Sequence, residues 1–171
     1  MRNEVFQVIP PQSFVVFSTA LILGLIALTA YLWIKVSNVR YITLGVMVIT
    51  LAICAYFCIV APYQTSIILN DKIEIIAPPY AHKRIDKTAV LKSYLADISK
   101  DKNLKLVLRV GGTSFGSYRV GWFKLKNGKT ALIVATRSNV VCFELKDGIV
   151  MLSPNDFDRF VGALKDRGYL T

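Results

Sequence analysis

Two long stretches without an ionisable side chain constrain this chain more than any other feature of its sequence. Residues 14–34 contain no Asp, Glu, Lys, Arg or His, and neither do residues 41–70. An α-helix rises about 1.5 Å per residue, so roughly 20 apolar residues cross the ~30 Å hydrocarbon layer of a bilayer. We therefore expect transmembrane helices at residues 14–34 and 41–62, preceded by an N-terminal tail at residues 1–13.

The connection between these helices is short, because only residues 35–40 separate them. A linker of this length requires the two helices to run antiparallel and to pack side by side. Trp33 and Tyr41 lie near this connection, where a membrane interface favours aromatic side chains. The first apolar run is too long for a signal peptide, so we interpret it as a retained anchor. The absence of ionisable groups from both spans argues against a transporter or a proton relay.

The charged residues concentrate in the second part of the chain. From Pro62 onward it carries 18 of the 21 Lys and Arg residues and 10 of the 11 Asp and Glu residues. Residues 63–171 are enough for one small core, so we expect a single domain there. The three cysteines Cys54, Cys58 and Cys142 have no regular spacing, which argues against a disulfide framework and favours packing roles.

Short β-strands separated by turns are predicted for most of this domain. Residues 104–110 carry an apolar side chain at every second position, with Lys105 and Arg109 between them, as a half-buried strand does. A glycine-rich turn is expected at residues 111–116, and a type I′ hairpin turn at Asn127-Gly128. Residues 154–167 carry apolar side chains at helical spacing, with Ser153 as the expected N-cap and Gly168 able to close the helix.

The predicted fold is therefore an α+β membrane protein. A two-helix transmembrane hairpin precedes a mostly antiparallel β barrel or sandwich, and one C-terminal amphipathic helix ends the chain. A strand meander closed by one helix resembles the bacterial pleckstrin-homology-like (bacterial PH) domain family, in its membrane-anchored form. The resemblance extends over about residues 64–166, and it is carried by five segments: residues 109–116, residues 121–125, Asn127-Gly128, Asp147-Gly148, and the helix start at residues 152–157 with Phe160.

The resemblance implies a fold, but it supplies no ligand and no activity. Phe115 occupies a position in the glycine-rich turn where the family pattern has proline. Basic residues near the membrane exit and around this turn form the candidate surface for a ligand or a partner, since anionic lipid attracts each by about 1 kcal/mol. The candidate residues are Lys83, Arg84, Lys87, Arg109, Gly112, Ser114, Arg119, Lys124 and Lys126.

Two simpler interpretations compete with this surface. The basic residues could form a solvated face that keeps a small domain soluble, and the glycines could serve a turn that needs unusual backbone angles. The single histidine, His82, has no partners at metal-ligand or catalytic spacing, so we predict no metal, no cofactor and no enzymatic activity. A sequence pI of about 9.7 permits nucleic-acid binding, but the membrane anchor argues against it.

The sequence thus predicts a membrane-anchored, non-catalytic binding module. It would dock a protein partner or anionic lipid headgroups at the membrane surface, and it could also form homo-oligomers. The alternative is an accessory subunit of a larger integral membrane complex, whose hairpin packs against partner helices. We expect a multi-pass location in a bacterial inner membrane with the β domain in the cytoplasm, because the domain is basic and has no disulfide framework.

Overall fold

A computed structural model of the chain describes residues 3–35 and 40–170. It contains two compact units, one formed by Met1–Ile9 with Tyr63–Thr171 and the other by Pro10–Pro62. Each unit is described by itself below. Positions 36–39 of the expected linker lie outside the described residues.

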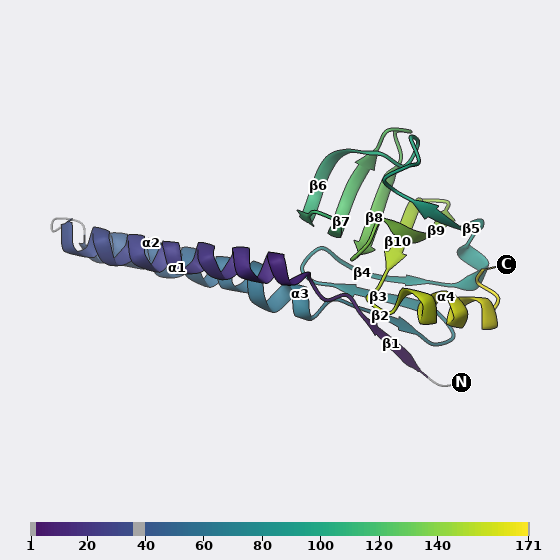
Figure 1. Cartoon of the computed structure of the whole chain (residues 1–171), viewed down its shortest axis with the longest axis horizontal. Coiled ribbons are helices and arrows are strands. Elements are labelled where there is room, and N and C mark those ends of the chain that lie inside the picture. The colour runs from purple at the N-terminus through teal and green to yellow at the C-terminus, as the bar shows by residue number, and fades with distance from the viewer. Residues whose placement is uncertain (1–2, 36–39, 171) are drawn as a thin grey trace. The chain divides into compact units, whose positions relative to one another are not determined.

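The second unit consists of helices that run side by side (Figure 1). In chain order these are α1 at Gln12–Lys35, α2 at Arg40–Ala55, a π-helical turn η1 at Tyr56–Val60 and α3 at Ala61–Tyr63. The segments Gln12–Lys35 and Leu44–Tyr63 are long and apolar enough to cross a bilayer, and only 6% of each apolar window is buried within the chain. Core helices of a soluble domain would instead be mostly buried.

The hydroxyl side chains on these helices form hydrogen bonds within their own helix. The hydroxyl groups of Ser18, Thr19, Thr29 and Thr50 each donate a hydrogen bond of 2.7–2.9 Å to the backbone carbonyl four residues earlier. Such bonds leave no hydroxyl proton without a partner in an apolar environment. The helical unit therefore presents an apolar exterior despite these four residues.

The first unit contains a four-stranded antiparallel sheet. Its strands, in spatial order, are β1 at Glu4–Gln7, β2 at Ser66–Leu69, β3 at Ile73–Ala77 and β4 at Ala81–Ile85. Strand β1 comes from the residues expected to form a tail. It pairs with β2, and the Val8 N–H donates to the Thr65 carbonyl at 3.1 Å. The chain therefore leaves this sheet before the helices and returns to it directly after them.

A six-stranded sheet completes the β structure. Its spatial order is β5-β9-β10-β8-β7-β6, and β10 runs parallel to β8 while the other neighbours are antiparallel. The strands are β5 at Lys92–Asp97, β6 at Leu106–Phe115, β7 at Tyr118–Leu125, β8 at Thr130–Ala135, β9 at Asn139–Leu145 and β10 at Gly148–Ser153. Among the described residues β5 and β6 are the edge strands of this sheet, so the two sheets are open. Of the two expected forms, barrel or sandwich, the barrel is therefore wrong.

One face of the six-stranded sheet packs with the four-stranded sheet and the C-terminal helix α4, at Phe157–Asp166. Phe160 of α4 is fully buried and meets the Phe6 ring edge-on, with 5.1 Å between ring centroids. Burial of a side chain of this size is worth about 1.5–3 kcal/mol. Glu4 contacts the guanidinium groups of Arg159 and Arg167 at 3.3 and 3.1 Å, which fastens β1 to α4.

Helix α4 starts later than the sequence pattern predicts. It begins at Phe157 rather than at residue 154, because Ser153 is the last residue of β10 and Asp156 occupies the N-cap position. Its end follows expectation: the Gly168 N–H bonds to the Lys165 carbonyl and the Tyr169 N–H to the Leu164 carbonyl, both at 2.8 Å. Gly168 has a φ of 64°, as a Schellman cap requires.

Two turns also differ from expectation. Residues 111–115 belong to strand β6, and the turn is formed by Gly116 and Ser117, with a φ of 59° at Gly116. At Asn127-Gly128, only Gly128 has a positive φ, and its N–H bonds to the Leu125 carbonyl at 3.0 Å. This is a three-residue loop built on a type I turn, rather than the expected type I′ turn.

Candidate functional site: the β6–β7 surface

Two glycines bring strands β6 and β7 unusually close together. Gly112 and Gly121 lie opposite each other, with φ of 155° and 130°. A Cβ atom on Gly112 would lie 2.8 Å from the Gly121 Cα atom, so neither position has room for a side chain. Gly112 therefore serves the close approach of two strands, and it lies within β6 rather than in the turn that the simpler interpretation of the glycines predicts.

Strand β6 then presents apolar side chains at the edge of the sheet. Its pairing with β7 shifts register between Leu106 and Leu108 and again between Arg109 and Gly111, so Val107 and Val110 are extra residues in two β-bulges. Val107, Leu108 and Val110 are 66%, 59% and 62% exposed. The alternation of residues 104–110 predicts that Leu108 and Val110 lie in the core, and the bulges are the reason that they do not.

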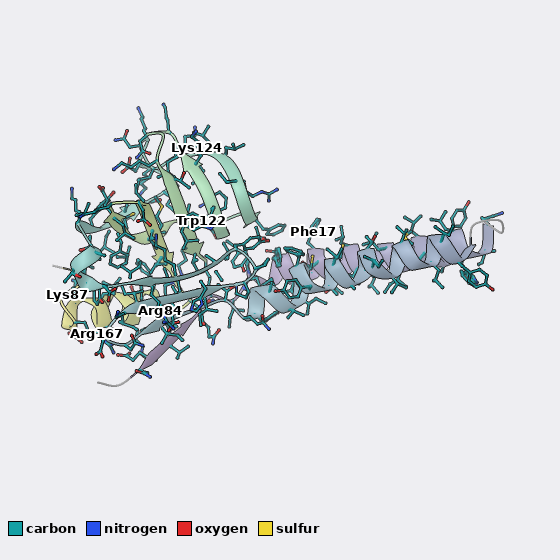
Figure 2. The ribbon with its side chains drawn as sticks, turned by 180° about the vertical axis from the view of Figure 1, so that it is seen from behind. Phe17, Arg84, Lys87, Trp122, Lys124 and Arg167 are labelled. Carbon is teal, nitrogen blue, oxygen red and sulfur yellow. The ribbon has the colours of Figure 1, made fainter. Side chains whose placement is uncertain are left out.

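Basic residues surround these apolar side chains. Residues 102–143 include eight Lys and Arg residues and no Asp or Glu. Lys124 lies opposite Leu108 across the β6–β7 ladder, and the Lys126 N–H bonds to the Lys105 carbonyl at 2.8 Å. Figure 2 shows Lys124 projecting from this part of the sheet. We call the following set the β6–β7 surface: Lys105, Val107, Leu108, Arg109, Val110, Lys124 and Lys126.

The cations of this surface form no ion pair in the part of the chain that the structure describes. Across residues 3–35 and 40–170, no ion pair involves Lys105, Arg109, Lys124 or Lys126. All four residues are exposed to solvent. Their charge is therefore available to a ligand without first breaking a contact within the domain.

The predicted cations on β4 and η2 already form contacts within the domain. Lys83 and Arg84 lie on β4, where Lys83 contacts Asp147 at 2.8 Å and Arg84 contacts Glu74 at 2.9 Å. Lys87 lies on the 3₁₀ helix η2, at Lys87–Ala89, and its Nζ donates to the Arg167 carbonyl at 3.0 Å. Figure 2 shows Lys87 and Arg167 close together and well apart from Lys124. The structure thus separates the predicted basic residues into two groups.

These contacts also change the acidity of the carboxylates. Hydrogen bonds from His82 and then from Arg84 lower the pKa of Glu74 below its ordinary value. The hydrogen bond from Lys83 lowers the pKa of Asp147 in the same way. Both carboxylates therefore stay ionised at neutral pH and hold the β4 cations in place.

Arg119 differs from the exposed cations. It lies on β7 opposite Ser114, and it is half-buried. Its buried Nη1 atom has no hydrogen-bond partner among the described residues, and burial lowers the pKa of its guanidinium. Ser114 is exposed and lies beyond the two β-bulges of β6. We place neither residue in the β6–β7 surface.

The described residues contain few side chains suited to metal binding or to nucleophilic catalysis. Among residues 3–35 and 40–170, no group of three or more His, Cys, Asp or Glu side chains could hold a metal ion. Cys142 is fully buried on β9, and burial raises the pKa of its thiol to about 12. A thiol with such a pKa is protonated at neutral pH and is a poor nucleophile.

The β domain matches a known family. The model of a family described as the bacterial PH domain matches residues 65–168, which is more than half of the 171-residue chain. No curated protein and no solved structure matches the chain. The matched segment extends from the start of β2 through the end of α4, so it leaves out β1 and the helical unit.

Proposed function

The chain belongs to the bacterial PH domain family, and we propose that it is a membrane-anchored, non-catalytic module that binds acidic groups at the surface of its own membrane. PH-like domains generally serve as binding modules rather than as enzymes. The β6–β7 surface is the binding face in this proposal. The β4 cations and Arg119 take no direct part in it.

The helical unit supports the anchoring part of the proposal. Its two apolar segments have the length of bilayer spans, and only 6% of each apolar window is buried within the chain. The chain passes from the domain into the helices after Ile9 and back at Tyr63, so both ends of the hairpin are attached to one sheet. A domain attached in this way stays near the headgroups.

The observation that carries the binding part is the lack of acidic residues between positions 102 and 143. Each basic residue near an anionic membrane gains about 1 kcal/mol, and this attraction fades within a Debye length of about 8 Å at physiological salt. Four exposed cations without acidic partners would together gain a few kcal/mol by this estimate. Salt should weaken the binding, because the cations are exposed.

Lysine acetylation of the full chain in nanodiscs tests this proposal. We expect Lys124 and Lys126 to react more slowly in discs that contain phosphatidylglycerol than in discs of phosphatidylcholine alone. Lys165, an exposed residue of α4, should react equally in both. Equal reactivity of Lys124 in both discs would contradict binding to acidic lipid. Protection that appears only with a stoichiometric integral partner, co-purified in mild detergent, would instead favour the accessory-subunit alternative.

The location of the domain needs its own experiment. We propose a bacterial inner membrane with the β domain in the cytoplasm. Cysteines introduced as Lys146→Cys and Ser37→Cys should then differ in intact cells, with only the cysteine at position 37 reacting with a membrane-impermeant reagent. The opposite labelling pattern would place the domain outside the cytoplasm.

A further inference from the structure

We propose that the free edge of strand β6 inserts into the interfacial layer of an anionic bilayer. In this arrangement Val107, Leu108 and Val110 contact the upper acyl chains, while Arg109 and Lys124 meet the headgroups. The inference rests on the proposed function and makes it more specific, because it names lipid as the acidic partner and assigns the contacting strand.

The exposed apolar side chains are the first reason. Val107, Leu108 and Val110 fall within four consecutive positions, and each is about three-fifths exposed. They lie on a strand whose other edge pairs with none of the strands in the described part of the chain. Isolated apolar residues on a surface are ordinary, whereas a contiguous apolar patch rimmed by charge marks a membrane or protein contact.

The β-bulges decide between lipid and a protein strand. An added strand would need a regular row of N–H and C=O groups along β6, but the extra residues Val107 and Val110 interrupt that row. A lipid layer requires no register, so the bulges do not hinder insertion. They turn neighbouring apolar side chains outward instead.

Charge argues against a second copy of the same edge. Pairing β6 with β6 around Arg109 would place this residue of one chain opposite the same residue of the other, and like charges opposite each other in a sheet destabilise the pair. An anionic bilayer complements this positive charge. Lys and Arg can also extend along an apolar surface while their charged ends stay in water, which suits a strand lying at the headgroup level.

The opposite edge of the sheet provides a matched control. Leu95 on β5 is 54% exposed, which is close to the exposure of Leu108. However, Asp97 follows two residues later on β5, and Glu144 lies opposite Lys92 on the neighbouring strand β9. This edge therefore combines an exposed leucine with acidic neighbours, which an anionic surface repels.

Quenching by nitroxide-labelled lipids tests the inference in the full chain. Cys54 and Cys58 are replaced by alanine, and an environment-sensitive fluorophore is attached at Leu108→Cys, Leu95→Cys or Ile26→Cys in separate samples. The bilayers contain phosphatidylcholine with or without phosphatidylglycerol. All three sites are exposed within the chain, so the substitutions should leave the fold intact.

We expect the label at position 108 to be quenched at least twofold more strongly with phosphatidylglycerol than without it, while the label at position 95 stays unquenched. Quenching at position 26 in both bilayers would show that the helices are inserted. Quenching at 26 combined with equally weak signals at 108 and 95 would overturn this inference and leave the anchor intact. Absence of quenching at 26 would overturn the anchor and, with it, the inference.

Discussion

The Nζ atom of Lys83 lies 2.8 Å from the Oδ2 atom of Asp147, and this ion pair joins strand β4 to the turn between β9 and β10. Lys83 also lies 5.9 Å from the centre of the Trp122 ring, whose Nε1 donates to the Tyr80 carbonyl at 3.0 Å. These contacts connect the four-stranded sheet to the six-stranded sheet. Lys83 is therefore a structural cation, although its position in the sequence places it among the candidate binding residues.

Replacing Lys83 should affect stability more than binding. We expect Lys83→Ala to lower the free energy of unfolding by about 1 kcal/mol or less, because the pair is partly exposed to solvent. Thermal denaturation measures this change. The protection of Lys124 by phosphatidylglycerol should be the same as in the unmodified chain. Loss of that protection would show that the β4 cations take part in binding after all.

Reversing charge on the β6–β7 surface should have the opposite outcome. Lys124→Glu combined with Lys126→Glu is expected to abolish the additional quenching of the label at position 108 that phosphatidylglycerol causes, and to leave the melting temperature nearly unchanged. Both side chains are exposed and unpaired, so little is lost in the folded domain. Lys146→Glu with Lys165→Glu makes the same change in net charge elsewhere and should preserve the lipid effect.

The domain should lose stability in acid through Glu74. Its pKa is lowered in the folded state, so its contribution to stability is fully present above its ordinary value of 4.5 and is lost as the pH falls through the folded-state value. Melting temperatures recorded from neutral pH to below that range should fall less steeply for Glu74→Gln than for the unmodified chain. Identical slopes would rule out the contacts with His82 and Arg84 as the cause.

The contact of α4 with β1 should matter for folding of the domain. Phe160→Ala removes a fully buried ring and should cost about 3–5 kcal/mol. Asp158→Ala on the exposed side of the same helix serves as the control and should change stability by less than about 0.5 kcal/mol. Denaturant unfolding followed by the fluorescence of Trp122 would detect the difference. Equal stabilities would contradict the packing of Phe160 against Phe6.

Arg119 offers a substitution expected to be harmless or stabilising. Its half-buried guanidinium has no acidic partner among the described residues, so its burial is not offset by an ion pair. Arg119→Met keeps the length of the side chain and removes the charge, and we expect an equal or higher melting temperature. A marked loss of stability or of lipid-dependent quenching would show a partner or a ligand for this residue.

Much of this fold follows from local patterns in the sequence. The ion-free runs indicate the helices, alternation and turn residues indicate most of the strands, and the spacing of Phe157, Phe160 and Leu164 indicates the last helix. Strand β1 does not follow, because its pairing with β2 depends on residues some 60 positions away. The partners of Lys83 and Arg84 cannot be predicted from local patterns either. Asp147 and Glu74 come close to these cations only when the strands pack and pair.

The exposure of the apolar side chains on β6 cannot be predicted from the sequence pattern, for a different reason. Residues 104–110 carry an apolar side chain at every second position, and this spacing predicts that Leu108 and Val110 face the core. Two bulges shift the register, so both side chains are exposed instead. The absence of acidic residues from positions 102–143 is a signal in the sequence itself, and it indicates where the cations stay unpaired.

Amide hydrogen exchange of the full chain in nanodiscs tests the central claim most directly, because it compares both basic groups in one measurement. Adding phosphatidylglycerol to phosphatidylcholine discs should slow exchange along β6 and in the turn after β7, and should leave residues 81–89 unchanged. Slower exchange at residues 81–89 without any change along β6 would contradict the assignment of the membrane contact to the β6–β7 surface.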